Sequence, residues 1–449
     1  MKEAIAYFNQ LVALDTAAAR RQYELLYADM EARNVRYAGQ VMQTLLRPYL
    51  ISEEQDRELR FATETVMAIV AKAERALFAG HPQWVYDFLG FSETERGLLQ
   101  VDPGYPASIV FTRLDGFFNE NRLQFIEFNH DSPGGIGYSD RLVEILRPLP
   151  LMERLAEKYE LRYDPLQPKL LEAILSTYRE YGGSTTPAVA IVDWADVKTR
   201  HDFEIIRDFF RAHGLSCIIV DPREVEIRRG ALFAGDFKID LVYRRVLLIE
   251  LMQKADEVKA FLDAYRSRLA CFVNSFRCRL TENKSFFQFL SDPDHAELFS
   301  ATEQAILARY IPWTRRVREG YTDFHGARID LCDFMGRQRE RFVLKPNDSY
   351  GGQGVCLGAT CDSATWEKIL GTALREGWVA QEHVSIPLEP FPVIDGETVA
   401  LKDLHVNIGP YYIGGRYCGS IARASLSSVI NVNAGGGGTP TFVVGEARL

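Results

Sequence analysis

Four polar residues between Ser108 and Asp140 have types and spacings that could do chemistry. Arg113 and Asp115 stand two residues apart, and Glu127 and Asn129 repeat that spacing further along the chain. Asp, Glu and Asn supply the hard oxygen ligands that suit Mg²⁺, which normally shares its coordination shell with substrate phosphates. A nearby arginine suits a bidentate grip on a phosphate or a carboxylate. On one shared surface, these side chains would suit a metal ion and a phosphorylated ligand.

We expect a β-hairpin to bring the four side chains together, because side chains two residues apart along a strand lie on the same face. A turn centred on Glu120 would put Arg113 opposite Glu127 and Asp115 opposite Phe125, with the polar residues on one face. A shift of one residue would send the two polar pairs to opposite faces, so the expectation depends on the register. A lone hairpin of this kind is more often exposed to water. The glycine-rich segment HDSPGGIG that follows favours a site, because it lets the backbone approach a ligand closely.

A second group of residues combines a lysine with a glycine-rich loop. A predicted strand ends at Lys345, a loop with Gly351, Gly352 and Gly354 follows, and a second strand is predicted over Val355–Leu357. This is not a Walker A loop, which needs GK[ST] at the start of a helix. A loop between two strands can instead close over phosphates as a flap, with its backbone N–H groups as donors. A plain glycine hairpin is the alternative.

Two further segments carry weaker signals. The strand predicted over 378–384 contains Gln381 and Glu382, whose backbone and carboxylate could contact an adenine and a ribose. Lys284 is predicted in the first turn of a helix that Thr281 caps. A cation there opposes the helix dipole, which hints at an anionic ligand, although an exposed lysine is the default interpretation.

Composition and charge exclude several classes of protein. The 449 residues are 47% hydrophobic and 25% charged, as in a soluble globular protein with two or three structural units. The net charge of −9 argues against a nucleic acid or an anionic membrane as partner. No run of about 18 apolar residues occurs, so we expect no membrane span.

The N-terminal segment and the cysteines favour a cytoplasmic protein. The first residues include acidic ones and no cleavable apolar core, so we expect no signal peptide. The seven cysteines are odd in number and scattered, and none forms a C-x-x-C motif. This pattern fits a reduced protein without structural zinc.

The predicted secondary structure and the motifs divide the chain into four regions. Residues 1–100 are predicted as an N-terminal helical region, and residues 101–164 contain the hairpin. Residues 165–280 alternate short apolar strands with helices, which predicts an open α/β unit. Residues 281–449 hold the glycine-rich loop and several strands.

The open α/β unit supplies further candidates. Such sheets bind ligands at the carboxyl ends of their strands, where Asp193, Asp221, Arg244 and Arg245 are expected. Each of these is more often structural.

Together these segments resemble a circularly permuted ATP-grasp ligase of the glutathionylspermidine synthase-like family, in its synthetase part only. The resemblance covers roughly residues 100–449. In ordinary ATP-grasp enzymes the lysines and the flap precede the metal carboxylates, whereas here they follow. The matching motifs are R-x-D at 113–115, E-x-N at 127–129, NHDSPGGIG at 129–137, NK at 283–284, KP-x₄-GG-x-G from 345, QE at 381–382 and G-x-x-x-R at 419–423.

The resemblance implies an α/β fold with an ATP-grasp unit, a pre-ATP-grasp-like unit at 165–280, and ATP with Mg²⁺, two ions being expected. It also implies a role for each matching residue. The metal ligands would be Asp115, Glu127 and Asn129; the catalytic arginines Arg113 and Arg423; the phosphate-binding residues Lys284, Lys345, Gly351, Gly352 and Gly354; and the adenine–ribose residues Gln381 and Glu382.

The implied reaction is ATP- and Mg-dependent formation of an amide from a carboxylate and an amine, through an acyl phosphate. The substrates would be small molecules or peptides, which the sequence does not specify. An ATP-grasp phosphotransferase that forms no C–N bond is one alternative, and a non-catalytic nucleotide-binding protein is another. The sequence leaves open the oligomeric state and whether Asp131, Arg244 or Arg245 contacts a substrate.

Overall fold

The fold is organised around an eight-stranded sheet, in a computed structural model that describes residues 1–119, 122–349, 351–428, 430 and 437–448. The strands run in the order β3-β23-β22-β21-β4-β5, with β20 beside β21 and β6 beside β23. All pairs are antiparallel except β3 with β23. The strands are β3 (Tyr49–Ser52), β4 (Phe111–Asn119), β5 (Arg122–Asn129), β6 (Tyr159–Arg162), β20 (Leu388–Asp395), β21 (Thr398–Ile413), β22 (Arg416–Ser425) and β23 (Gly437–Ala447).

The predicted hairpin is formed by β4 and β5, but its register differs from the expected one. Arg113 pairs with Asn129 and Asp115 pairs with Glu127, so the partners are displaced by two residues. Because two residues is a full period of a strand, the four side chains still share one face. Residues 120–121, at the predicted centre of the turn, lie outside the described residues.

A β-bulge interrupts the hairpin beside these polar residues. Asp115 pairs with Glu127 and Gly116 with Phe125, which leaves Ile126 as an extra residue in β5. A bulge leaves its extra residue out of the ladder and bends the strand locally. It therefore changes the face presented by the residues on either side: Phe125 and Phe128 lie in the hydrophobic core, whereas Ile126 and Glu127 face a pocket.

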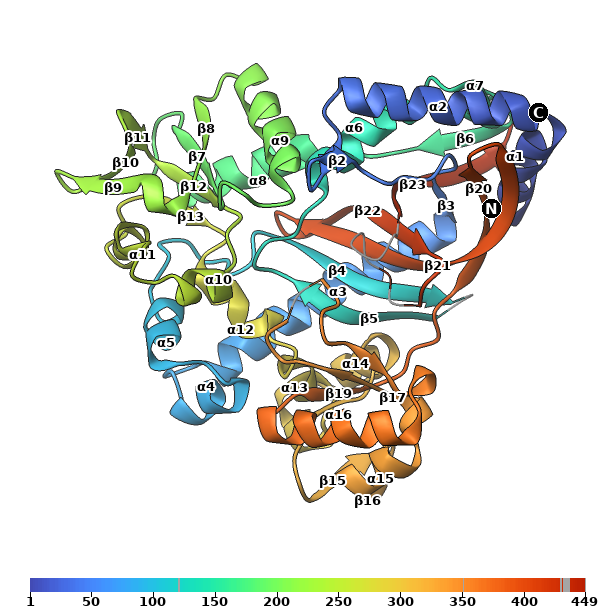
Figure 1. Cartoon of the computed structure of the whole chain (residues 1–449). Coiled ribbons are helices and arrows are strands. Elements are labelled where there is room, and N and C mark those ends of the chain that lie inside the picture. The colour runs from blue at the N-terminus through green and yellow to red at the C-terminus, as the bar shows by residue number, and fades with distance from the viewer. Residues whose placement is uncertain (120–121, 350, 429, 431–436, 449) are drawn as a thin grey trace.

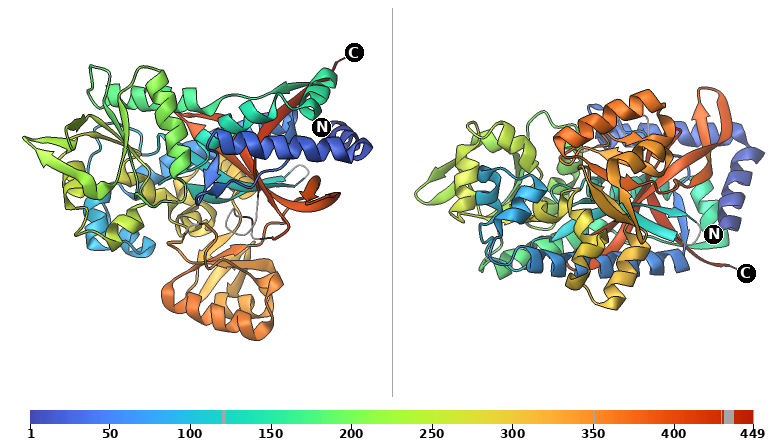
Figure 2. Two further views of the ribbon diagram at one scale, coloured as in Figure 1. Left: turned by 45° about the horizontal axis from the view of Figure 1, so that its top comes forward. Right: turned by 90° about the horizontal axis from the view of Figure 1, so that it is seen from below.

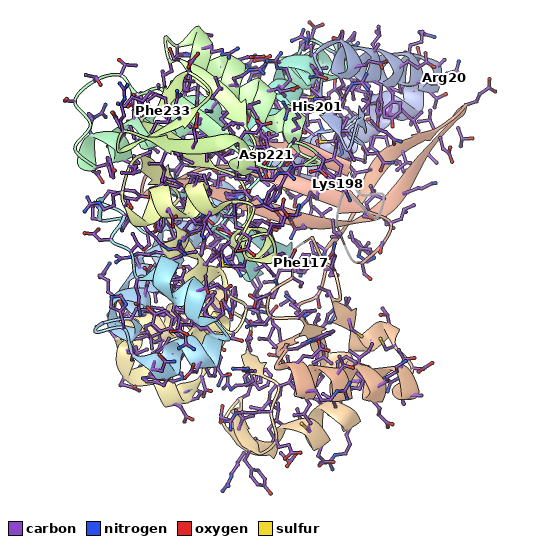
Figure 3. The ribbon with its side chains drawn as sticks, turned by 60° about the vertical axis from the view of Figure 1, so that its left-hand side comes forward. Arg20, Phe117, Lys198, His201, Asp221 and Phe233 are labelled. Atoms are coloured by element: carbon purple, nitrogen blue, oxygen red, sulfur yellow. The ribbon has the colours of Figure 1, made fainter. Side chains whose placement is uncertain are left out.

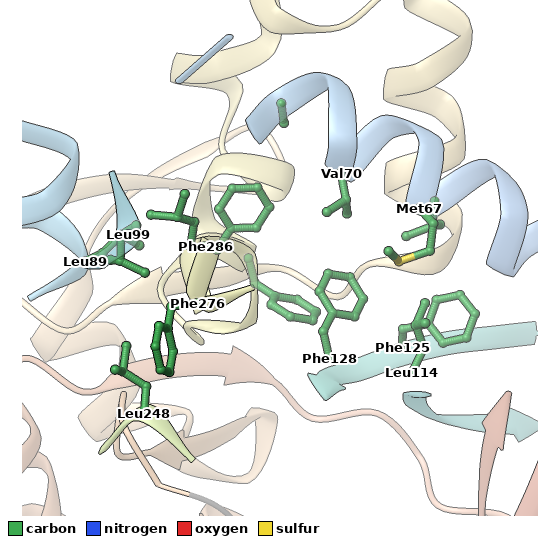
Figure 4. Close-up of a cluster of buried hydrophobic side chains, with 14 of the residues drawn as sticks. Met67, Val70, Leu89, Leu99, Leu114, Phe125, Phe128, Leu248, Phe276 and Phe286 are labelled. Carbon is green, nitrogen blue, oxygen red and sulfur yellow. The ribbon is translucent and has the colours of Figure 1, made fainter. Parts of the chain in front are cut away.

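The N-terminal region contributes the helix that covers one face of the sheet. Helix α3 begins after Ser52, which forms a capping box with Gln55. Its apolar face packs on Leu114, Phe125 and Phe128 of the hairpin (Figure 4). The elements before the hairpin are α1 (Lys2–Leu14), α2 (Thr16–Ala32), β1 (Arg36–Tyr37), β2 (Gln40–Val41), α3 (Glu53–Leu77), α4 (Gln83–Leu89) and α5 (Glu93–Leu99).

The predicted open α/β unit is present as a parallel sheet of order β13-β12-β7-β8. Alternate residues of its strands enter two different cores, because helices cover both faces. Its elements and the helices leading to it are α6 (Ile136–Leu146), α7 (Pro150–Lys158), α8 (Leu166–Glu180), β7 (Val189–Val192), α9 (Arg200–Ala212), β8 (Cys217–Val220), η1 (Pro222–Glu224), β9 (Val225–Arg228), β10 (Ala231–Ala234), β11 (Phe237–Ile239), β12 (Leu241–Arg244), α10 (Leu248–Gln253), α11 (Lys259–Arg266) and β13 (Cys271–Val273).

A small unit carries the glycine-rich loop on an antiparallel sheet of order β14-β19-β17-β18. It lies below the large sheet in Figure 1 and projects from it in Figure 2. The elements from residue 276 to 382 are η2 (Phe276–Cys278), α12 (Arg279–Glu282), α13 (Phe286–Ser291), η3 (Pro293–Leu298), α14 (Ala301–Tyr310), β14 (Thr314–Arg316), β15 (Tyr321–Phe324), β16 (Ala327–Asp330), α15 (Leu331–Arg337), η4 (Arg339–Arg341), β17 (Phe342–Lys345), β18 (Cys356–Leu357), η5 (Gly358–Thr360), α16 (Ser363–Glu376) and β19 (Val379–Glu382).

One predicted helix is wrong. Thr281 does not cap a helix that contains Lys284, because Thr281 lies within the short helix α12 and the chain turns before α13. Lys284 therefore lies in the turn between two helices, where the dipole argument does not apply. No helix in the described part of the chain is long and apolar enough to cross a membrane.

Candidate active site

The polar face of the hairpin forms one wall of a pocket, and the small unit forms the other. The pocket has a volume of about 170 Å³. In Figure 3, Phe117 of β4 lies above the small unit, on the wall of the pocket that the hairpin forms. Eleven of the twelve residues predicted for the site line the pocket: Arg113, Asp115, Glu127, Asn129, Lys284, Lys345, Gly351, Gly352, Gln381, Glu382 and Arg423.

Asp115 is the centre of a charged network on the large sheet. Its side chain is only 4% exposed and accepts from Arg113 Nε at 2.8 Å, from Arg423 at 2.6 Å and from Asn129 Nδ2 at 3.0 Å. Burial by itself would raise the pKa of this carboxyl group, but the two arginines hold the pKa well below its usual range. Asp115 is therefore ionised at any physiological pH, and it fixes both guanidinium groups at the pocket wall.

Lys345 crosses from the small unit to the hairpin. Its Nζ donates to Gln381 Oε1 at 2.7 Å and to the carbonyl of Ile126, the bulged residue, at 3.0 Å. The bulge makes this second bond possible, because it frees the carbonyl of an unpaired residue. Burial lowers the pKa of Lys345 to about 8, with Glu127 opposing the shift and Lys284 adding to it.

Lys284 joins the hairpin to the base of the glycine-rich loop. Its Nζ lies 3.1 Å from Glu127 Oε1 and also donates to the carbonyl of Ser349. Asn347 at the start of the loop accepts from the Ser285 N–H at 2.9 Å, so the loop base is tied to the turn that holds Lys284.

The loop itself needs its glycines. Gly351, Gly352 and Gly354 all adopt positive φ angles, of 64°, 75° and 72°. A Cβ atom on Gly354 would also lie 2.7 Å from Pro346 Cγ. Gly354 is the one predicted site residue that does not line the pocket; it shapes the end of the loop instead.

The strand β19 supplies Gln381 and Glu382, but their side chains have partners within the protein. Gln381 accepts from Lys345 and donates to Thr314 Oγ1 at 3.1 Å. Glu382 lies 2.8 Å from His325 Nε2 and 3.3 Å from an Arg341 nitrogen. Gln381 thus positions Lys345. The apolar side chains that line the pocket together with Gln381 could contact a flat apolar ligand. Those apolar residues include Phe117, Val343, Val355, Leu357, Val384 and Ile386.

The donor set on the hairpin fits a hard divalent cation. Asp115 and Glu127 are directly opposite each other across the two strands, and Asn129 follows on the same face. Two carboxylates and an amide oxygen are ligands that Mg²⁺ accepts when phosphates complete its shell. Among the described residues, no cluster of three His, Cys, Asp or Glu side chains is suited to a metal. The set on the hairpin is not such a cluster, because its third member is Asn129.

The candidates at the rim of the open α/β unit separate into two kinds. Arg244 and Asp131 are both fully buried and form an ion pair of 2.5 Å, so they hold the unit against the hairpin. Asp221 is paired with Arg223 at 2.7 Å. Asp193 and Arg245, by contrast, line a second cavity.

The sequence did not reveal the residues that hold the site in place through hydrogen bonds to its side chains or to the neighbouring backbone. Asn407 of β21 accepts from Arg423 at 2.8 Å and donates to the Gly116 carbonyl at 3.0 Å. Glu282 accepts from the His130 N–H at 2.8 Å, and burial raises the pKa of its carboxyl group to about 7. Each is a single polar residue in an otherwise ordinary segment, and the only sequence signal for Asn407 is a polar residue within an apolar strand.

No protein-family model matches this chain, and no curated protein matches it in sequence. Its structure is similar to that of a glutathione synthetase-like effector, GSS30, from Globodera pallida, with a TM-score of 0.63 and 10% identity over 94% of this chain and 96% of that one. The two chains share a fold. Because the identity is so low, the likeness speaks for the fold alone, and the predicted family and circular permutation stay predictions.

Two other structures have lower scores. One is described as a putative gamma-glutamylcysteine synthetase from Methylobacillus flagellatus, with a TM-score of 0.40 and 12% identity over 85% of each chain. The other is D-cycloserine synthetase DcsG, with a TM-score of 0.32 and 14% identity over 58% of this chain and 75% of that one. Neither likeness is strong enough to carry an argument.

Proposed function

We propose that this protein is an ATP- and Mg-dependent carboxylate–amine ligase that forms an amide bond through an acyl phosphate. The observation that carries the proposal is the convergence of eleven predicted residues, from segments up to 310 positions apart in the sequence (113 to 423), on one pocket. The likeness of the fold to that of a glutathione synthetase-like effector is consistent with this proposal. Circular permutation of an ATP-grasp unit, the glutathionylspermidine synthase-like family and a cytoplasmic location belong to this proposal.

The pocket has the two kinds of lining that a nucleoside triphosphate needs. Apolar side chains around Val343, Leu357 and Val384 would hold the base, and Lys284 and Lys345 would neutralise the phosphates. The glycine-rich loop would add backbone N–H groups over the phosphates and exclude water from the acyl phosphate.

The reaction would proceed in two transfers. A substrate carboxylate oxygen attacks the γ-phosphorus, and the bond to the bridging oxygen breaks to release ADP. The amine nitrogen then attacks the acyl carbon, the carbon–oxygen bond to phosphate breaks, and the nitrogen loses its proton. Arg113 and Arg423, which Asp115 holds at the pocket wall, would stabilise the charge that develops on the transferring phosphoryl group.

Glu127 and Asn129, with Asp115, would hold the magnesium ions. The ions would supply charge neutralisation for the phosphates. Asp115 would join this set when the arginines that it now binds turn to the phosphates, because both of its oxygens already accept from them. Glu127 is bound by a single lysine, which makes it the more direct metal ligand.

Calorimetric titration of ATP into the protein, with and without Mg²⁺, tests the proposal. We expect magnesium-dependent binding that Glu127→Ala weakens strongly, because that variant removes a carboxylate from the metal set. Arg416→Ala is a matched control, since Arg416 is a β22 arginine whose side chain is 56% exposed and which is not among the residues that line the pocket. Magnesium-independent ATP binding, or wild-type binding in Glu127→Ala, would contradict the metal assignment. Screening carboxylate–amine pairs for ADP and amide then separates a ligase from a phosphotransferase, which would leave a stable phosphorylated product.

A further inference from the structure

A second cavity, of about 510 Å³, opens at the carboxyl edge of the open α/β unit. Asp193 follows β7 and Arg245 follows β12, so both lie where ligands bind in such sheets. Asn129 and Gly351 line this cavity and also the nucleotide pocket, so the two spaces meet between the hairpin and the glycine-rich loop. A molecule held in the second cavity could therefore reach the transferring phosphate.

Arg245 is a buried arginine that lacks an ion pair. It is 3% exposed, and within the described chain no carboxylate oxygen lies within 4 Å of its guanidinium nitrogens. One of these nitrogens donates to the Pro133 carbonyl at 2.5 Å, while Nε has no acceptor. The adjacent Arg244 is the opposite case, since Asp131 pairs with it at 2.5 Å. Burying a guanidinium with no carboxylate in direct contact costs free energy, which the carboxylate of a ligand would reduce.

Two buried carboxylates face Arg245 without pairing with it. Asp202 uses its oxygens to accept from the backbone N–H groups of Gly135 and Tyr138, at 3.1 and 3.0 Å. Asp193 is 4% exposed and accepts from the Trp194 N–H at 2.8 Å. Burial raises the pKa of Asp193 to about 7 and Arg245 opposes that shift, so the two groups interact although they stay more than 4 Å apart. Opposite charges held apart in this way leave room for a ligand that carries both.

The remaining charges on the wall are mixed in sign. Lys198, labelled in Figure 3, and Lys254 stand with Asp196, Glu250 and Glu282 around the cavity. A polycation would meet Arg245 and the lysines, and a polyanion would meet the carboxylates. A zwitterion can satisfy both sets.

We propose that this cavity binds the α-amino acid group of one substrate, with its carboxylate on Arg245 and its ammonium on Asp193. The reacting group of that substrate would extend past Asn129 and Gly351 to the phosphates. This inference rests on the proposed function for its chemistry, but the binding itself does not require ATP.

Calorimetry with the twenty proteinogenic L-amino acids as probes tests the inference on the intact chain. We expect at least one to bind, and its carboxamide and its N-acetyl derivative each to bind about tenfold or more weakly, since each derivative loses one charge. Arg245→Gln should weaken the amino acid about tenfold or more but leave its carboxamide unchanged. Arg266→Gln is the matched control, because Arg266 is a 39% exposed arginine of the same unit and is outside both linings.

Three results would overturn the inference: binding of none of the twenty probes, equal binding of the amino acid and its two derivatives, or wild-type affinity in Arg245→Gln. Should Arg245→Gln fail to fold, the comparison of derivatives on the wild-type protein still decides. ATP titration of the same protein keeps the two proposals apart. Amino acid binding without ATP binding would contradict the ligase proposal alone, and ATP binding without amino acid binding would contradict this inference alone.

Discussion

At the scale of single residues, Asp115 and Glu127 face each other but contribute differently to the stability of the protein. Asp115→Ala would leave two largely buried arginines, Arg113 and Arg423, without their carboxylate partner. Breaking a buried ion pair costs about 3 kcal/mol or more. Glu127→Ala would break the ion pair with Lys284. Because the Glu127 side chain is 27% exposed, the loss of this pair costs roughly 1 kcal/mol or less. We expect both variants to lose magnesium-dependent turnover and only Asp115→Ala to lose substantial stability. Urea denaturation compares them, and equal stabilities would contradict the role of Asp115 as the anchor of both arginines.

The depressed pKa of Lys345, about 8, predicts how ATP binding depends on pH. Bound phosphates favour the ammonium form, so they raise this pKa in the complex. Well below pH 8 the amine is protonated with or without ATP, and binding takes up almost no proton there. As the pH rises above 8, the amine must take up a proton from the buffer when ATP binds, so the affinity falls. Titrations at pH 8.5 in two buffers of different ionisation enthalpy should reveal this uptake. Lys345→Arg should abolish it, because arginine stays charged, and an identical proton uptake in that variant would contradict the assignment.

At the scale of elements, the glycine-rich loop depends on a backbone that only glycine adopts easily. Gly354→Ala would force an alanine into a φ of 72°, at a cost of about 1–2 kcal/mol, and would push a methyl group against Pro346. We expect a several-fold loss of ATP affinity. Gly371→Ala is the control, since Gly371 lies in the interior of α16 with only the end of Arg375 near its Cβ position. That change should stabilise the protein by about 0.5–1 kcal/mol and leave ATP binding unchanged. Equal ATP affinities in the two variants would show that the loop conformation does not matter.

The elements also show which parts of the site a sequence can reveal. The shared face of Arg113, Asp115, Glu127 and Asn129 was predictable, because alternation along a strand is a local property. The register was not, because the bulge at Ile126 depends on how β5 packs in the core, where Phe125 contacts Tyr310 of α14. The bulge is also what lets Lys345 reach a carbonyl of the hairpin, so this contact could not be predicted from the lysine and its glycines alone.

Predictions that needed long-range contacts failed or could not be made. The helix expected from Thr281 breaks at Lys284, because the side chain of Asn283 donates to the Leu89 carbonyl and the turn packs on the loop base. Asn407 supports Arg423 from the neighbouring strand, a relation that no spacing in the sequence encodes. Likewise, Arg244 and Arg245 are adjacent in sequence and alike in type, and only the fold gives one of them Asp131 as a partner.

At the scale of the whole molecule, the N-terminal region is part of the main sheet and its core. Strand β3 adds to the last strand, β23, in parallel, and Arg47 just before it is fully buried. The Arg47 guanidinium lies 2.5 Å from Glu389 of β20 and 4.0 Å from the centre of the Phe391 ring. The segment before β3 thereby joins a strand that is more than 340 positions away in the sequence.

Arg47→Ala should therefore destabilise the entire protein. The variant leaves Glu389 without its buried partner, which costs about 3–5 kcal/mol, whereas Arg416→Ala breaks an ion pair whose side chains are both more than half exposed and should cost below about 1 kcal/mol. Because Arg47 and the elements around it share continuous cores with the sheet, we expect one cooperative unfolding transition at a lower urea concentration. ATP affinity below the transition should match the wild type, since Arg47 is not among the residues that line the proposed nucleotide pocket. A separate early transition, with the rest of the protein unchanged in stability, would instead make the first hundred residues an independent domain.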